Sequence, residues 1–328
     1  MHTALTCPRL EALPGIHSFK RGCLLQAPFA ARSARLTPAS SRTTFSSAAV
    51  VDTPLKEARS TGVPSTVTAP RIARESLQTL EAQLDNGAAV GALRRFNQNL
   101  KNLPASSWGE KLRPVMHELA YNLESFNPAF TAVLLKVQST IGHSDYVQRD
   151  EALRLLVQPL AGEYGMHNDE PQGKTHRQLF SEFSQDLMHE SLESLLEQGA
   201  RPPAGVTLFQ QMMQDIMSGG QQSEIVAQAS YALGYNLAIE YLADYEKTWM
   251  LDSFRQLDAR VLKPQHRALT QWLFLEVHAE GEAEHAALGH AAVTAFVPAE
   301  HHDLLQSAML DHDRDFAVFY NHLADLLE

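Results

Sequence analysis

The sequence predicts an all-α protein folded as one multi-helical bundle, and three observations carry this prediction. From about Ile72 onward, apolar residues recur at helical spacing, as Leu77, Leu80 and Leu84 do. No segment alternates convincingly with the period of two that a half-buried strand requires. The Asn-Gly pair at 86–87 lies between helical segments, so it is typical of a helix stop and not of a hairpin.

Helix-start signals and apolar spacing place the following elements in order. Ser107 and Glu110 form a capping-box pattern that opens a helix, which we expect to end near Ser125. Pro128 is expected to begin another helix, since proline suits a first turn. A polar, turn-rich segment is expected at 162–174. Further helices are expected at about 146–161, 175–198, 205–218, 222–256, 264–290 and 299–327, which gives eight or nine in all.

The first fifty residues differ from the rest of the chain. They hold six Arg or Lys residues and one acid, Glu11, and they are rich in Ser, Ala and Thr. This profile is typical of an organellar transit peptide, although a basic tail without structure would share it. The Ser, Thr and Ala content favours the chloroplast, with the mitochondrion as the alternative. Residues 51–70 hold Pro54, Pro64 and Pro70 and are interpreted as a linker, so the folded domain is expected at 71–328.

Composition excludes several classes of function. The net charge is −11 for the whole chain and +5 for residues 1–50, which leaves −16 on the remainder and argues against nucleic-acid binding. No apolar run approaches the ~18 residues that a membrane span needs. Both cysteines, Cys7 and Cys23, lie in the expected transit peptide. The folded domain is therefore expected to contain no disulfide, zinc-thiolate site, iron–sulfur cluster or cysteine nucleophile.

The strongest chemical motif lies late in the chain. His278, Glu282 and His285 stand at i, i+4 and i+7, so on a helix their side chains fall within roughly 60° of one another. Two imidazoles and a carboxylate on one face can chelate a borderline transition metal, iron being the first candidate. A solvated acidic helix is the alternative interpretation. Phe274, Gly289 and Ala292 continue the same face with apolar or small residues, which favours a buried site.

Other residues can extend this motif to a site for two metal ions. Glu163 precedes the polar segment, and His176 follows it at the head of a helix. Glu240 lies within an apolar helix and needs either a metal or a basic partner there. Glu246 is a second candidate in place of Glu240, but it lies on a different face of that helix. Glu282-x-x-His285 also matches ferritin-like bundles, yet no second Glu-x-x-His pair is present.

The order of these residues resembles that of the haem-oxygenase-like di-iron oxidase and oxygenase superfamily. The resemblance covers residues 110–325 and is carried by Glu163-Tyr164-Gly165, by His176-x-x-Leu179-Phe180, by Glu240 after Gly234, and by the motif at 278–285. It implies a haem-oxygenase-like bundle that holds two Fe(II) ions per chain. The implied ligands and catalytic residues are Glu163, His176, Glu240, His278, Glu282 and His285.

By the same resemblance, the protein would be an iron-dependent oxidoreductase that uses O2 to oxidise a small organic molecule. Candidate substrates are a fatty acid and an amino-acid or aromatic precursor, and one group of the superfamily forms p-aminobenzoate from its own tyrosine. Tyr235, Tyr241 and Tyr245 lie near Glu240 in the sequence. Glu282 departs from the family pattern, because Asp is usual at its position. A homodimer is compatible with the sequence.

Two rival functions follow from the same pattern. The first is a non-catalytic helical binding protein on a degenerate haem-oxygenase-like fold. The second is a thiaminase-like hydrolase, which requires a cysteine nucleophile that residues 51–328 do not contain. Iron content and reactivity with O2 discriminate the oxidase from the binding protein.

Overall fold

The computed structural model describes residues 70–328, apart from 168–169, 172 and 198–202. The expected transit peptide, and the expected linker except Pro70, lie outside these described residues. The described part is all-α, as predicted, and a single short antiparallel hairpin is added to it. None of its helices is both long and apolar enough to cross a membrane.

Ten α-helices make up the described part of the chain. They are α1 (Arg74–Leu84), α2 (Ala88–Lys101), α3 (Trp108–Gln138), α4 (Tyr146–Glu163), α5 (His176–Met188), α6 (Leu192–Glu197), α7 (Pro203–Ser218), α8 (Ile225–Leu257), α9 (Leu273–Phe296) and α10 (His302–Leu327). The hairpin pairs β1 (Met166–His167) with β2 (Glu170–Pro171).

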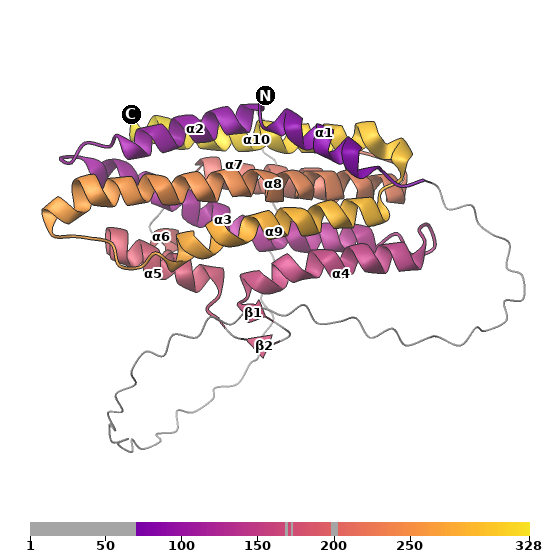
Figure 1. The fold of residues 1–328 in the computed structure, drawn as a ribbon, viewed down its shortest axis with the longest axis horizontal. Coiled ribbons are helices and arrows are strands. Elements are labelled where there is room, and N and C mark those ends of the chain that lie inside the picture. The colour runs from indigo at the N-terminus through magenta and orange to yellow at the C-terminus, as the bar shows by residue number, and fades with distance from the viewer. Residues whose placement is uncertain (1–69, 168–169, 172, 198–202) are drawn as a thin grey trace, which may run out of the picture. The chain divides into compact units, whose positions relative to one another are not determined.

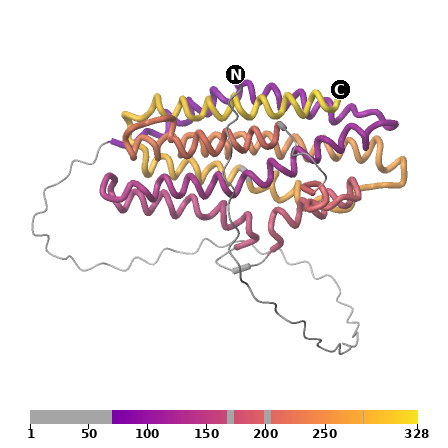
Figure 2. The backbone as a smooth tube through the Cα atoms, turned by 180° about the vertical axis from the view of Figure 1, so that it is seen from behind, coloured from indigo at the N-terminus to yellow at the C-terminus, as the bar shows by residue number. Residues whose placement is uncertain are grey.

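Helix α8 lies at the centre of the helical bundle. It packs against α9 on one side and against α2 and α10 on the other, and α4 packs on the far side of α9. Figures 1 and 2 show this order from opposite sides, with α3 and α7 packed against each other nearby. Large aromatic side chains fill the core between these helices, including Phe96, Tyr235, Phe254 and Tyr320. Because α8 has neighbours on several sides, acidic residues on different faces of it are buried.

Helix α3 corrects one prediction from the sequence. It is a single helix of 31 residues that runs through Pro114 and Pro128, where the sequence predicted one helix ending near Ser125 and another beginning at Pro128. A proline inside a helix costs about 3 kcal/mol. Buried side chains on both sides of Pro128, such as Met116 and Val133, pack into the same core and offset that cost. The predicted capping bond is also absent, because the Ser107 side chain accepts no hydrogen bond at the helix start.

The helix predicted at 175–198 is divided in two. It ends at Met188, and His189 follows in the left-handed conformation with φ of 60° before α6 begins at Leu192. Such a residue is a frequent helix terminator, because its own N–H can bond back to the last turn. Helix α9 begins at Leu273, nine residues later than predicted, after the 3-10 turn at Lys263–Gln265 and an extended segment.

Candidate metal centre and the adjoining cavity

The loop after α4 brings two distant parts of the sequence together. Gly165 has a φ of +70°, and a Cβ atom built there would lie 2.6 Å from the carbonyl oxygen of Gly173. The Gly173 N–H also donates to the Gly165 carbonyl oxygen at 3.2 Å. Glycine is therefore required at this close approach. The resulting turn and hairpin return the chain so that α5 begins beside the end of α4, where Glu163 lies.

A capping box fixes the start of α5 and with it His176. The Thr175 hydroxyl accepts a hydrogen bond from the Gln178 N–H at 3.2 Å, and the Gln178 side chain accepts one from the Thr175 N–H at 2.9 Å. This reciprocal arrangement satisfies two of the N–H groups that every helix start leaves open. His176 is the first residue of the helix that follows. The cap thus sets the backbone position of His176. The sequence predicts this residue at the head of a helix.

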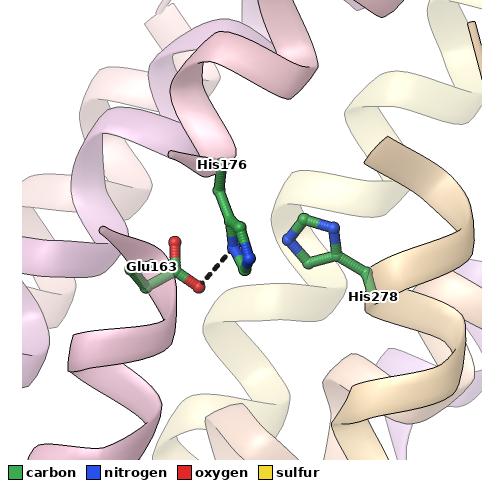
Figure 3. Close-up of side chains that lie close together, drawn as sticks. All are labelled: Glu163, His176 and His278. Atoms are coloured by element: carbon green, nitrogen blue, oxygen red, sulfur yellow. Dashed lines mark ion pairs between the residues drawn. The ribbon is translucent and has the colours of Figure 1, made fainter. Parts of the chain in front are cut away.

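Glu163, His176 and His278 come together from α4, α5 and α9 (Figure 3). The His176 Nδ1 atom lies 2.7 Å from the Glu163 Oε1 atom. The rings of His176 and His278 are 4.2 Å apart between centroids. One potential ligand atom from each residue lies within 4.8 Å of the other two, so the three residues can share one metal ion. Glu163 and His278 are buried, at 6% and 5% exposed.

His278 is oriented as a metal ligand would be. Its Nδ1 atom lies 2.5 Å from the Phe274 carbonyl oxygen, a distance at which Nδ1–H donates to that oxygen and leaves the Nε2 lone pair available. Burial, and then the charge of Lys247, hold the pKa of His278 well below its usual range. The ring is therefore neutral at physiological pH, which is the form that binds a metal. A carboxylate with two imidazoles suits iron or another borderline divalent metal.

The remaining sequence-predicted residues lie on α8 and α9. Glu240 is 1% exposed, and its Oε2 atom lies 3.8 Å from the His285 Nδ1 atom. The structure thus brings Glu240 and His285 near each other but not into the group of three. Glu282 lies on α9 one turn before His285, and its side chain is outside the part of the structure described. Three of the six residues are brought within the reach of one ion, and two form a neighbouring pair.

Glu246, the alternative to Glu240, lines a small cavity that His278 also lines. Its Oε1 atom accepts a hydrogen bond from the Tyr320 hydroxyl and lies 3.1 Å from the Lys247 Nζ atom. Both Glu240 and Glu246 are buried, although they lie on different faces of α8. Tyr241 and Tyr245 both donate to Asp85, and Tyr235 donates to Asp315. These three tyrosines are not among the described residues that line the cavity.

The cavity has an open volume of about 50 Å³ and lies among α3, α4, α7, α8, α9 and α10. Glu163 and His278 form part of its wall, and His312 and Phe316 of α10 form another part. His312 is not among the site residues predicted from the sequence. Leu305, Met309 and Phe316 recur around it at helical spacing, and that pattern could have indicated a buried histidine.

An open groove is lined by His176 and His278 of the candidate metal centre. It runs between α4 and α9 and is lined by apolar side chains such as Leu153, Val157 and Val277, with His176 and His285 also in its wall. His176 and His278 thus line the groove, and His278 lines the cavity as well. The three candidate metal ligands therefore contribute to the walls of both the groove and the cavity.

No family model and no curated protein matches the sequence. Solved structures do match the fold. A CADD-like protein of unknown function from Nostoc punctiforme superposes with a TM-score of 0.57 and 16% identity, covering 76% of this chain and 96% of that one. A TenA homolog from Pseudomonas syringae pv. tomato superposes with a TM-score of 0.53 and 16% identity, and the match covers 74% of this chain and 92% of that one. The chain therefore has the haem-oxygenase-like helical fold of these proteins, as the sequence resemblance implied.

Proposed function

We propose that this protein is a non-haem iron oxidase or oxygenase that uses O2 to oxidise a small organic molecule. The observation that carries the proposal is the buried group of Glu163, His176 and His278, whose ligand atoms converge within 4.8 Å. Three ionisable side chains in one buried place are costly unless they satisfy one another or bind a cation. The proposal assigns one Fe(II) ion to this group.

A second Fe(II) ion is assigned to Glu240, Glu282 and His285. The contact of 3.8 Å between Glu240 and His285 supports this assignment, because it joins α8 to the helix that also carries His278. Bound iron would supply the redox chemistry and a place for O2. The protein's own residues orient the ligands and exclude water. Glu163 lies against the imidazole of His176, the Phe274 carbonyl fixes the tautomer of His278, and burial keeps that ring neutral.

Metal analysis of protein purified anaerobically with Fe(II) tests the proposal. About two irons per chain are expected, with an absorbance change when O2 is added. Protein that retains no iron above background contradicts the proposal. Protein that retains iron but consumes no O2 with any of a panel of fatty acids, amines and aromatic amino acids favours the non-catalytic binding protein.

A matched pair of variants tests which carboxylate of α8 is a ligand. Glu240→Gln is expected to lower the iron content from about two to about one per chain, because the amide removes an anionic ligand. Glu246→Gln is expected to keep both irons, since that side chain is engaged by Tyr320 and Lys247. The reverse result would make Glu246 the ligand. Two irons per chain in both variants, as in the wild type, would remove Glu240 and Glu246 from the ligands of the proposal.

The location of the protein is proposed from the sequence alone. The basic, Ser- and Ala-rich residues 1–50 support delivery to the chloroplast, with the mitochondrion as the alternative. A fluorescent protein fused after residue 50 should enter one of these organelles. Diffuse cytosolic fluorescence would contradict both.

A further inference from the structure

His312 is a buried histidine whose ring nitrogens have no hydrogen-bond partner among the described residues. The side chain is 1% exposed, and both Nδ1 and Nε2 are buried without a partner. The ring packs between aromatic neighbours, at 5.0 Å from the Tyr235 ring and 5.2 Å from the Phe316 ring. Buried polar groups in folded proteins are almost always hydrogen-bonded, so this one calls for a partner.

The place of His312 in the cavity wall shows where such a partner could bind. The same cavity is bounded by Glu163 and His278 and by apolar side chains that include Ile239 and Ala243. Burial lowers the pKa of His312 to about 3, so the ring is neutral and offers one N–H and one lone pair. A group that can both donate and accept a hydrogen bond, such as a hydroxyl or an amide, matches either nitrogen.

The charged groups of the cavity wall, and His278, already have partners. Glu246 accepts from Tyr320 and lies against Lys247, and Glu163 lies against His176. His278 Nδ1 is engaged by the Phe274 carbonyl oxygen. Two carboxylates therefore face one ammonium group around the cavity, and the electrostatic balance disfavours an additional anion.

From these observations we propose that the cavity is a binding site for a small neutral group, recognised by His312. The volume of about 50 Å³ is well above the ~10–15 Å³ that a single water needs, so the cavity suits a short polar molecule or the polar end of a larger one. The ligand class is a neutral alcohol or amide with a short apolar body, and a carboxylate of the same shape should bind more weakly. The ligand would be the substrate only if the proposed iron centre is correct. Its binding to the cavity does not depend on the iron centre.

Acetamide and acetate form a matched pair of probes, because they have nearly the same shape and differ in charge. Their binding to metal-free protein can be measured by saturation-transfer NMR on the methyl signals. Acetamide is expected to bind in the millimolar range, as suits so small a ligand, and at least about tenfold more tightly than acetate.

Two variants locate the binding. His312→Phe keeps a ring of similar size but no hydrogen-bonding atom, and it should weaken acetamide binding about tenfold or more. Ala243→Leu fills the cavity and leaves His312 in place, and it should also abolish binding. His302→Phe, the same substitution on a more exposed position of α10, is the control and should bind as the wild type does. Circular dichroism shows whether each variant is folded. If His312→Phe does not fold, acetamide binding to Ala243→Leu is the deciding measurement.

Several results would overturn the proposal. These are no binding of acetamide, acetate binding as tightly as acetamide, or acetamide binding unchanged in a folded His312→Phe or Ala243→Leu variant. Tighter binding of ethylammonium than of acetamide would also overturn it, because Glu163 and Glu246 would then select the ligand. Since the probes need no metal, iron content measured separately distinguishes failure of this proposal from failure of the iron centre.

Discussion

Two walls of the same cavity each carry a buried histidine, and the two histidines differ in their partners. On the wall formed by α4 and α9, His278 has one nitrogen engaged by a backbone carbonyl and lies beside His176 and Glu163. On the wall formed by α10, His312 lies between Tyr235 and Phe316 with neither nitrogen engaged by a described residue. Burial lowers the pKa of both.

The difference teaches that burial alone does not assign a role to a histidine. The neighbours do so, because a carbonyl that fixes the tautomer, with a carboxylate and a second imidazole close by, prepares a ring for a metal. Aromatic neighbours that make no hydrogen bond to the ring leave it able to bind a neutral ligand. The predictions below separate these two roles.

The largest expected effect is on metal affinity. His278→Ala should weaken Fe(II) binding by more than about 100-fold, because even the loss of a residue that only orients a ligand costs 10–100-fold. His312→Phe should leave the affinity within about threefold of the wild type. Anaerobic competition with a chelating dye measures both, and His143→Ala on the exposed loop before α4 is the control. A similar loss of Fe(II) affinity in His278→Ala and His312→Phe would show that the two histidines do not differ in their role.

The pH dependence of stability should reveal His312. Its pKa is about 3 in the folded protein against an ordinary 6.5, so below pH 6.5 the unfolded chain binds a proton that the folded chain does not. The free energy of unfolding should therefore fall as the pH falls from 6.5, by up to about 1.4 kcal/mol per pH unit from this residue.

Urea unfolding at pH 7.5 and pH 5 measures this contribution. Between the two, the wild type should lose about 2 kcal/mol more than His312→Phe, which lacks the titrating ring. The comparison uses the change with pH, so the baseline stability of the variant does not enter. Equal losses in the two proteins would show that His312 is not buried as a neutral ring.

The smallest expected effect concerns the cap that holds His176. Thr175→Ala removes the hydrogen bond that the Thr175 side chain accepts at the start of α5. This loss should lower the free energy of unfolding by about 1 kcal/mol. Ser107→Ala at the start of α3 is the matched control and should cost close to nothing, since the Ser107 side chain makes no capping bond. Thermal unfolding measures both. Weaker Fe(II) binding in Thr175→Ala alone would show that the cap also positions the metal ligand.

Much of the fold could be predicted from apolar spacing, because each helix packs one face into the core. The breaks between helices were less predictable. Ser107 with Glu110 and Thr175 with Gln178 both match a capping box, yet only the second makes the bonds. The local sequence around Pro128 predicts a helix start, but the packing of side chains before and after it makes α3 continuous. Such choices depend on tertiary contacts that outweigh local preference.

The sequence by itself determined the helical class and the chemical types of the candidate ligands in their order along the chain. It placed Glu163 before a turn and His176 at a helix start, because glycines and helix-start positions are local signals. The tertiary structure decided which of these residues meet. It joined His278 to Glu163 and His176, set Glu240 beside His285, and placed His312 in the cavity wall with no hydrogen-bond partner among the described residues. Distances between helices are fixed by the packing of the whole core, which no single helix encodes.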